Sequence, residues 1–154
     1  MPERERPLRR IDGAHGLLFE RLLDDRTGPG RLIHDMDGLG EAIAASLRAL
    51  FSVRAPASAL GRAAEARTVV DYGVAALEDV RISSADERLR HAEELKRAVR
   101  AFEPRLEDVE IAIVPTGGRA GGAKVSLSGA YRLGAVVEPF HFVVEDEKKQ
   151  GDAR

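Results

Sequence analysis

The hydrophobic pattern first predicts one long helix in the second half of the chain. From Ser84 onward, apolar residues recur every three or four positions, which places them on one face of a helix. The expected buried face comprises Leu89, Ala92, Leu95, Val99 and Phe102. Ser84 stands three residues before Glu87, which is the spacing of an N-terminal capping box. Pro104 disfavours helical geometry at Glu103, so the helix is predicted to end there.

After this helix the pattern changes to alternation of apolar and polar residues, which is typical of half-buried strands. Three strands are predicted at about residues 107–114, 124–133 and 139–144, and Pro139 suits the start of the third. Residues 115–122 are rich in glycine and are expected to form a hairpin tip. A small meander needs a cover for its apolar face. The predicted fold class is therefore α+β, with N-terminal helices and the long helix packed on a three-stranded antiparallel meander.

A second helix is predicted from about residue 37 to residue 51, with Asp35 or Asp37 as its N-cap. Its expected buried face comprises Leu39, Ile43, Leu47 and Leu50. Residues 55–68 are rich in alanine and are expected to form a loop. Gly73 is expected to break the chain after a short apolar turn. That turn comprises Val69, Val70 and Tyr72.

The two ends of the chain are expected to lie outside the folded domain. Residues 1–13 carry four arginines and two prolines, a composition typical of a flexible arm, and residues 146–154 form a polar tail. One domain is therefore expected at residues 14–145. Within it, the apolar segment 17–23 predicts two turns of helix. Such a short helix is not stable alone in water, so it must pack on this domain or on a partner.

Composition and charge exclude several classes of protein. The formal net charge is −2 and the pI is about 6.1, which argues against a dedicated nucleic-acid-binding domain. The chain has no cysteine, and aromatic residues make up only 5% of it, so neither a disulfide framework nor an aromatic stacking platform is expected. No signal peptide or long apolar stretch is present, so we expect a cytoplasmic protein without membrane insertion.

Candidate catalytic chemistry is sparse. The four histidines are scattered and do not have the spacing of metal ligands. They are His15, His34, His91 and His141. The glycine-rich stretch lacks the lysine and threonine of a phosphate-binding loop and joins two predicted strands. Carboxylate pairs occur at positions 24–25, 93–94 and 107–108 and are expected on solvated faces. The sequence therefore predicts no catalytic residue, no metal site and no cofactor.

Four motifs occur in an order that resembles a known family. They are LFERL at 18–22, a helix ending in arginine at 39–54, DYG at 71–73 and FEPRL at 102–106, and three strands follow. This order is similar to that of the phage baseplate wedge family, often labelled "lysozyme-like", and within it to the TssE-type subunits of type VI secretion baseplates. The similarity extends over about residues 15–145, and the glutamate–proline–arginine corner is its most specific motif.

The resemblance implies an assembly function with two kinds of partner. Glu103, Pro104 and Arg105 would dock on the helical bundle formed by other baseplate wedge subunits. The sheet, with Phe140 and Phe142 as further partner-binding candidates, would initiate the contractile sheath by strand addition at an open edge. The proline bend is expected to present the acid and the arginine in opposite directions. The alternative for the corner is an ion pair internal to the protein.

Two other functions remain open at this stage. A small muramidase-like glycosidase would need two carboxyl groups that flank a cleft, and the paired acids are its only support in the residues. A binder of nucleic acid or of an anionic surface would use the arginine-rich arm, without a basic domain behind it.

Overall fold

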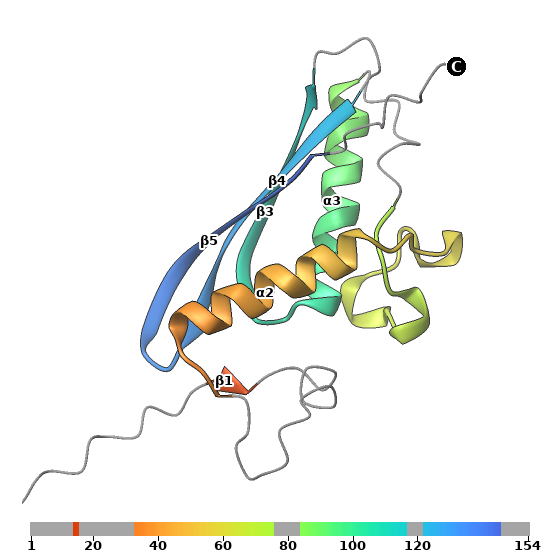
Figure 1. Ribbon diagram of the computed structural model, residues 1–154. Helices are drawn as coiled ribbons and strands as arrows, with labels where there is room; N and C mark the ends of the chain where they lie inside the picture. Colours follow the sequence, from red (N-terminus) through yellow and green to blue (C-terminus); the bar gives the residue numbers. More distant parts are fainter. Residues whose placement is uncertain (1–13, 16–32, 76–83, 117–121, 146–154) are drawn as a thin grey trace, which may run out of the picture.

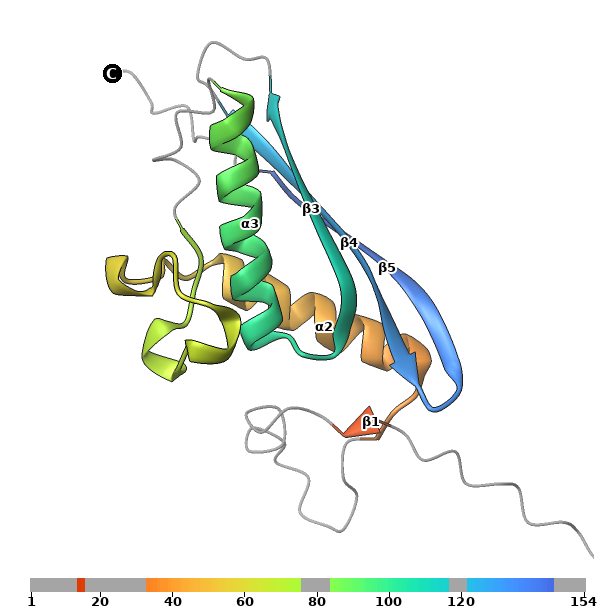
Figure 2. The same ribbon diagram turned by 180° about the vertical axis from the view of Figure 1, so that it is seen from behind.

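In the computed structural model, the described residues are 14–15, 33–75, 84–116 and 122–145. Two long helices lie against one face of a twisted three-stranded sheet (Figures 1 and 2). The helices are α2 (Met36–Phe51) and α3 (Ala85–Phe102), and the strands are β3 (Leu106–Thr116), β4 (Gly122–Leu133) and β5 (Val136–Glu145). The sheet is antiparallel in the order β3-β4-β5. The predicted α+β fold class is confirmed.

Helix α3 begins and ends where the sequence predicts. The hydroxyl of Ser84 accepts a hydrogen bond of 3.1 Å from the Glu87 N–H, and the helix stops at Phe102. Its buried apolar residues are Leu95, Ala98 and Val99. The prediction for Leu89 is wrong, because this side chain is 66% exposed. It lies in the N-terminal half of α3, which extends past α2 (Figure 1).

Helix α2 also follows its sequence signals. Asp35 is the N-cap, and its side chain accepts a hydrogen bond of 2.9 Å from the Gly38 N–H. The four predicted apolar positions are all buried. Gly40 lets the helix approach the sheet, because a Cβ at this position would lie 2.9 Å from the hydroxyl oxygen of Tyr131. A residue with a side chain here would force the Tyr131 ring to shift.

The strands are longer than predicted, and two details differ from simple alternation. Pro139 lies inside β5, opposite Ala130, and not at the start of the strand. This position is tolerated because β5 is an edge strand, so the missing N–H is not needed for pairing with β4. In β3 the register shifts between Glu107 and Glu110, and Asp108 has a φ of 49°. This β-bulge turns both Leu106 and Val109 toward the core.

Residues 52–75 include the predicted loop at 55–68 and contain three short 3-10 turns. They are η1 (Ala57–Ala59), η2 (Ala64–Ala66) and η3 (Val69–Asp71). An antiparallel pair, β1 (Ala14–His15) with β2 (Ile33–His34), was not predicted.

Four segments for which the sequence makes a prediction lie outside the described residues. They are the arm at 1–13, the apolar segment at 17–23, most of the glycine-rich stretch (117–121) and the tail at 146–154.

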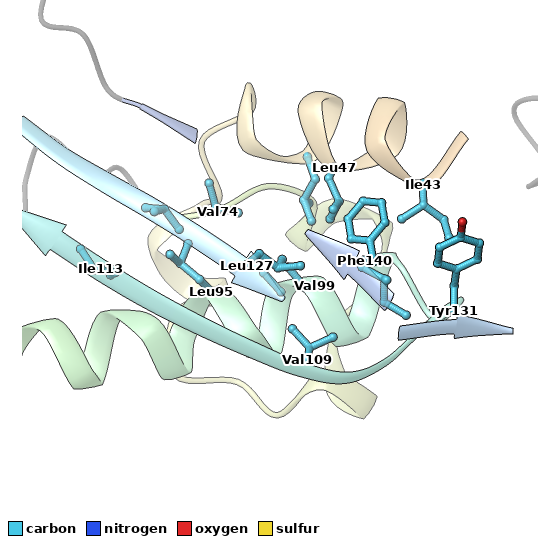
Figure 3. Close-up of a cluster of buried hydrophobic side chains, with 14 of the residues drawn as sticks. Ile43, Leu47, Val74, Leu95, Val99, Val109, Ile113, Leu127, Tyr131 and Phe140 are labelled. Atoms are coloured by element: carbon cyan, nitrogen blue, oxygen red, sulfur yellow. The ribbon is translucent and has the colours of Figure 1, made fainter. Parts of the chain in front are cut away.

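The core lies between the two helices and the inner face of the sheet (Figure 3). Figure 3 labels Ile43, Leu47, Val74, Leu95, Val99, Val109, Ile113, Leu127, Tyr131 and Phe140. The β3 and β4 side chains of this group come from alternating positions, apart from the shift at the bulge. Helix α2 contributes all four predicted residues and α3 contributes Leu95 and Val99, so the core positions the end of α3 against the start of β3.

Candidate partner-binding site

The corner of the molecule consists of residues 103–105, between the end of α3 and the start of β3. The Glu103 N–H still donates to the carbonyl of Val99 at 2.7 Å, and the Glu103 carbonyl accepts from the Leu106 N–H at 3.2 Å. These two hydrogen bonds end the helix and begin the strand within three residues. Pro104 is exposed at the tip of the bend.

The two charged side chains of the corner bind each other. Arg105 donates from Nε to Glu103 Oε1 at 2.6 Å and from Nη2 to Oε2 at 2.7 Å. The Glu103 carboxylate is 0% exposed, and the Arg105 side chain is 14% exposed. The expectation that they point in opposite directions is therefore wrong. A buried carboxylate is unfavourable unless it is paired, and the planar guanidinium folds back to satisfy both oxygens.

A turn from the preceding loop lies beside the corner (Figures 1 and 2). The ring of Tyr72 packs edge-on against that of Phe102, with 5.1 Å between the ring centroids. Burial, together with the negative charge of Glu103, raises the pKa of the Tyr72 hydroxyl. The DYG motif and the FEPRL motif thus contact each other in the fold. Their first residues, Asp71 and Phe102, are 31 positions apart in the sequence.

Asp71 holds this turn in a fixed shape. Its Oδ2 accepts hydrogen bonds from the Thr68 N–H at 2.9 Å, from the Thr68 hydroxyl at 3.1 Å and from Arg62 Nη1 at 2.9 Å. The backbone hydrogen bond from Thr68 contributes most to lowering the pKa of Asp71, and it outweighs the opposing effect of burial. Val69 and Val70 lie within the same turn and are 82% and 76% exposed.

Gly73 allows the turn to rejoin the end of α2. Its φ is +121°, and a Cβ here would lie 2.6 Å from the Val53 carbonyl oxygen and 2.8 Å from the Ala55 nitrogen. The close approach permits two backbone hydrogen bonds of 2.9 Å, from Ala55 N–H to the Val74 carbonyl and from Val74 N–H to the Val53 carbonyl. At Gly73, where the sequence predicts a break, the backbone makes a close contact that requires a glycine.

A second buried ion cluster connects α3 to the loop. Glu94, expected on a solvated face, is buried and accepts hydrogen bonds from the Gly61 N–H at 3.0 Å, from Arg97 Nη2 at 2.7 Å and from Arg67. The expectation is wrong because Gly61 and Arg67 come from the loop, 33 and 27 residues away. Burial raises the pKa of Glu94. The hydrogen bonds and the arginine charges lower the pKa by more than burial raises it, so the net shift is downward.

The lowered pKa of Glu94 predicts a pH-dependent stability. A carboxyl group with a lowered folded-state pKa stabilises the fold above its ordinary value of 4.5, and this contribution is lost as pH falls through the folded-state pKa. Glu94→Gln should therefore be less stable than wild type near neutral pH, and the difference in stability should narrow as the pH falls below 4.5. Urea unfolding at several pH values measures this. Glu93→Gln, at the exposed neighbouring position, is the control and should show a smaller gap; equal gaps for both variants would contradict the assignment.

Phe140 and Phe142 lie on β5, across the sheet from the start of β3. Phe140 is 7% exposed and packs edge-on against Tyr131 at a centroid distance of 6.1 Å (Figure 3). Phe142 packs against Phe51 of α2, also at 6.1 Å. Both rings contribute to the core. A partner at this edge of the sheet would therefore meet mainly the backbone of β5.

Within the described ranges, no group of three or more His, Cys, Asp or Glu side chains lies close enough to hold a metal ion. A shallow hollow of about 540 Å³ beside α3 includes Glu93 and Glu94. A glycosidase acid needs a raised pKa, whereas Glu94 has a lowered one and is bonded to two arginines. No helix in the described part of the chain has the length and hydrophobicity to cross a membrane.

The fold and the corner define a small α+β protein in which a buried ion pair lies between α3 and β3, the first strand of the meander. Comparison with family models matches residues 37–133 to the family "Baseplate wedge protein gp25", which is 97 of the 154 residues. The chain belongs to this family.

The chain also matches one chain of a solved structure described as "The baseplate complex from the type VI secretion system". The identity is 12% and the TM-score is 0.47, with 71% of this chain and 98% of that chain covered. No curated protein matches the sequence.

Proposed function

We propose that the protein is a structural baseplate subunit of a contractile injection machine, of the type VI secretion kind, and acts by assembly rather than catalysis. The observation that carries the proposal is the family match over residues 37–133, which contains the corner, the DYG motif and α3. The order of the four sequence motifs supports the type VI assignment. Residues 14–145 would form the wedge domain, with 1–13 as an arm and 146–154 as a tail.

In this proposal the corner docks on the helical bundle of other baseplate wedge subunits. Glu103 and Arg105 give the corner a fixed shape, and Pro104 is its exposed tip. A surface that is already ordered loses little conformational entropy when it binds. The paired side chains therefore support docking by holding the end of α3 and the start of β3 in one arrangement.

The second part of the proposal is that β5 accepts a strand from the contractile sheath. Pro139 lacks an N–H, so its pairing with Ala130 is of the non-hydrogen-bonded kind, and alternate residues share this orientation. The backbone N–H and C=O groups of Val137, His141 and Val143 therefore face away from β4. Among the described strands none pairs with this edge of β5, which is the arrangement required for strand addition. Phe140 and Phe142 keep that edge in place by packing in the core.

The proposed function is tested by counting assembled sheaths in cells that carry a fluorescent sheath subunit. Deleting the protein should abolish sheath assembly, and the wild-type chain should restore it. Val143→Pro removes an outward N–H and should reduce assembly several-fold, whereas Val143→Thr keeps the N–H and should not. Normal sheath numbers in the deletion strain would contradict the proposed function, and equal effects of the two Val143 variants would contradict strand addition at β5.

A further inference from the structure

The three-stranded sheet has two edges, and the proposed function requires only one of them to accept a strand. β3 and β5 form the opposite edges, and α3 packs beside β3 (Figures 1 and 2). A free edge presents unpaired backbone groups to any strand that meets it, including a strand from a second copy of the same chain. A sheet with two open edges could therefore add a strand on either side.

The backbone groups that β3 presents at its edge follow from the pairing of the sheet. Pro139 of β5 has no N–H, so the groups of its β4 partner Ala130 point toward β3, and those of every second β4 residue do the same. The β3 residues opposite this set, at positions 110, 112 and 114, are therefore hydrogen-bonded to β4. The N–H and C=O groups of Ile111 and Ile113 lie between them and point away from the sheet.

A salt bridge crosses this edge of β3. Lys96 belongs to α3, on the inner face of the sheet, and its Nζ lies 2.8 Å from Glu110 Oε1. Glu110 belongs to the outer face, because it lies between Val109 and Ile111, which turn inward, and its side chain is 75% exposed. Since the other side of β3 is bonded to β4, the two charged side chains meet around the free edge. We call the Lys96–Glu110 pair the strap.

The strap is charged near neutral pH. The hydrogen bond from Lys96 to Glu110 and the charge of Lys96 lower the pKa of the Glu110 carboxyl, and the charge of Arg100, one turn further along α3, adds to this effect. A strand that approached Ile111 would have to displace or desolvate this ion pair. Charged side chains at an edge, lysine in particular, are a common means of preventing strand addition.

A β-bulge interrupts β3 directly before the strap. The register with β4 shifts between Glu107 and Glu110, and Asp108 has a φ of 49°. A bulge disrupts the ladder and increases the local twist, so an added strand could not continue past the strap toward the corner. The strap and the bulge are therefore adjacent, and Ile111 is the first residue after them.

Among the described residues, the β5 edge has neither device between Val136 and Val144. Its pairing with β4 is continuous, without a register shift, and its single carboxylate in this range is Glu138. Each edge strand contains one proline, Pro139 on β5 and Pro115 on β3, so a missing N–H does not distinguish the two edges. The strap and the bulge do distinguish them.

We propose that the strap and the bulge close the β3 edge, so that the three-stranded sheet accepts a strand at β5 alone. Lys96 and Glu110 thereby determine specificity, because they exclude a second strand without contacting the first. A single acceptor edge gives each subunit one attachment point for the sheath. It also prevents two copies of the free chain from pairing through β3.

The test opens the β3 edge in the purified full-length chain. Lys96→Ser with Glu110→Thr removes the strap and leaves the core unchanged. Because a bridge with an exposed partner contributes little to stability, the melting temperature should stay within about 3 °C of wild type. Sedimentation over a concentration series should show self-association at least about tenfold tighter than that of wild type, since new edge-to-edge hydrogen bonds can form.

Glu107→Thr with Arg132→Ser is the matched control. It removes an exposed bridge that joins β3 to β4 within the sheet and does not cross the free edge. This control should self-associate as wild type does. Hydrogen exchange locates the contact, because the amides of Ile111 and Ile113 should become protected as the opened variant associates, and should not change in the control.

Two results would overturn the proposal. One is an opened variant that self-associates no more tightly than wild type or the control, and the other is association that leaves the amides of Ile111 and Ile113 unprotected. Although the proposal rests on the proposed function, its test uses the purified chain, so the two can fail separately. Normal sheath numbers in the deletion strain would contradict the function, whereas only the behaviour of the opened variant decides whether the β3 edge is closed.

Discussion

Arg105→Leu is expected to lower the free energy of unfolding by about 3 to 5 kcal/mol, because it leaves the buried Glu103 carboxylate without a cation. Arg105 supplies both hydrogen bonds to that carboxylate, at 2.6 and 2.7 Å. For a chain of this length, such a loss lowers the melting temperature by roughly 10 °C. Thermal unfolding of the purified protein, followed by circular dichroism, measures the effect.

Two further variants distinguish a buried pair from a surface pair. Replacing both residues, Glu103→Leu with Arg105→Leu, removes the uncompensated charge and should be less destabilising than Arg105→Leu alone. Arg132→Leu removes the arginine of a surface pair, in which Arg132 and Glu107 are 3.5 Å apart and about half exposed. That variant should change stability by less than about 1 kcal/mol. Similar losses for Arg105→Leu and Arg132→Leu would show that the corner pair is not buried in solution.

Gly73→Ala is expected to cost about 2 to 3 kcal/mol, because a side chain here is strained and also meets backbone atoms. The φ of +121° is rarely adopted by residues with a Cβ, and that Cβ would lie 2.6 Å from the Val53 carbonyl oxygen. The backbone pairing between the end of α2 and Val74 would have to open. Urea unfolding measures the loss.

Gly61→Ala is the matched control for Gly73→Ala. Gly61 also has a positive φ, of +80°, but a Cβ there would have no neighbour within 4 Å. The substitution should cost only about 1 to 2 kcal/mol of backbone strain. A loss at Gly73 no larger than the loss at Gly61 would mean that the close approach to Val53 is not maintained in solution.

The parts of the fold that were predictable from sequence depend on local signals. Ser84 and Pro104 mark the ends of α3, and the capping side chain of Asp35 marks the start of α2. Both helices show the 3.6-residue period, and β4 shows a clear period of two, because each buries one face against a single core. The order of elements then fixes the α+β class.

The features that were missed depend on contacts between distant segments. The burial of Glu94 requires the Gly61 N–H and Arg67, and the residue pattern within α3 does not indicate this burial. The bulge at Asp108 shifts the alternation within β3 and is accompanied by Gly129 on β4, where a Cβ would lie 2.9 Å from the Glu107 carbonyl oxygen. Neither feature changes the hydrophobic pattern enough to be read from one strand or helix.

The bend between the long helix and the first strand was predicted in position, but the arrangement of its side chains was not. The sequence singled out the corner because the glutamate–proline–arginine motif at 103–105 is the most specific part of the family resemblance. It could not show that Arg105 folds back, since a bend at Pro104 allows several directions for the side chain. The neighbouring Val69 and Val70 were expected in an apolar turn, and only the structure shows that they face outward.

The most direct test of the baseplate function is the sedimentation of the tagged protein from its own cells. The expected result is that the chain sediments within a large particle together with other baseplate wedge subunits, identified by mass spectrometry. A chain that sediments only near its own mass of 16.7 kDa, while baseplate particles from the same cells sediment without it, would contradict the proposed function.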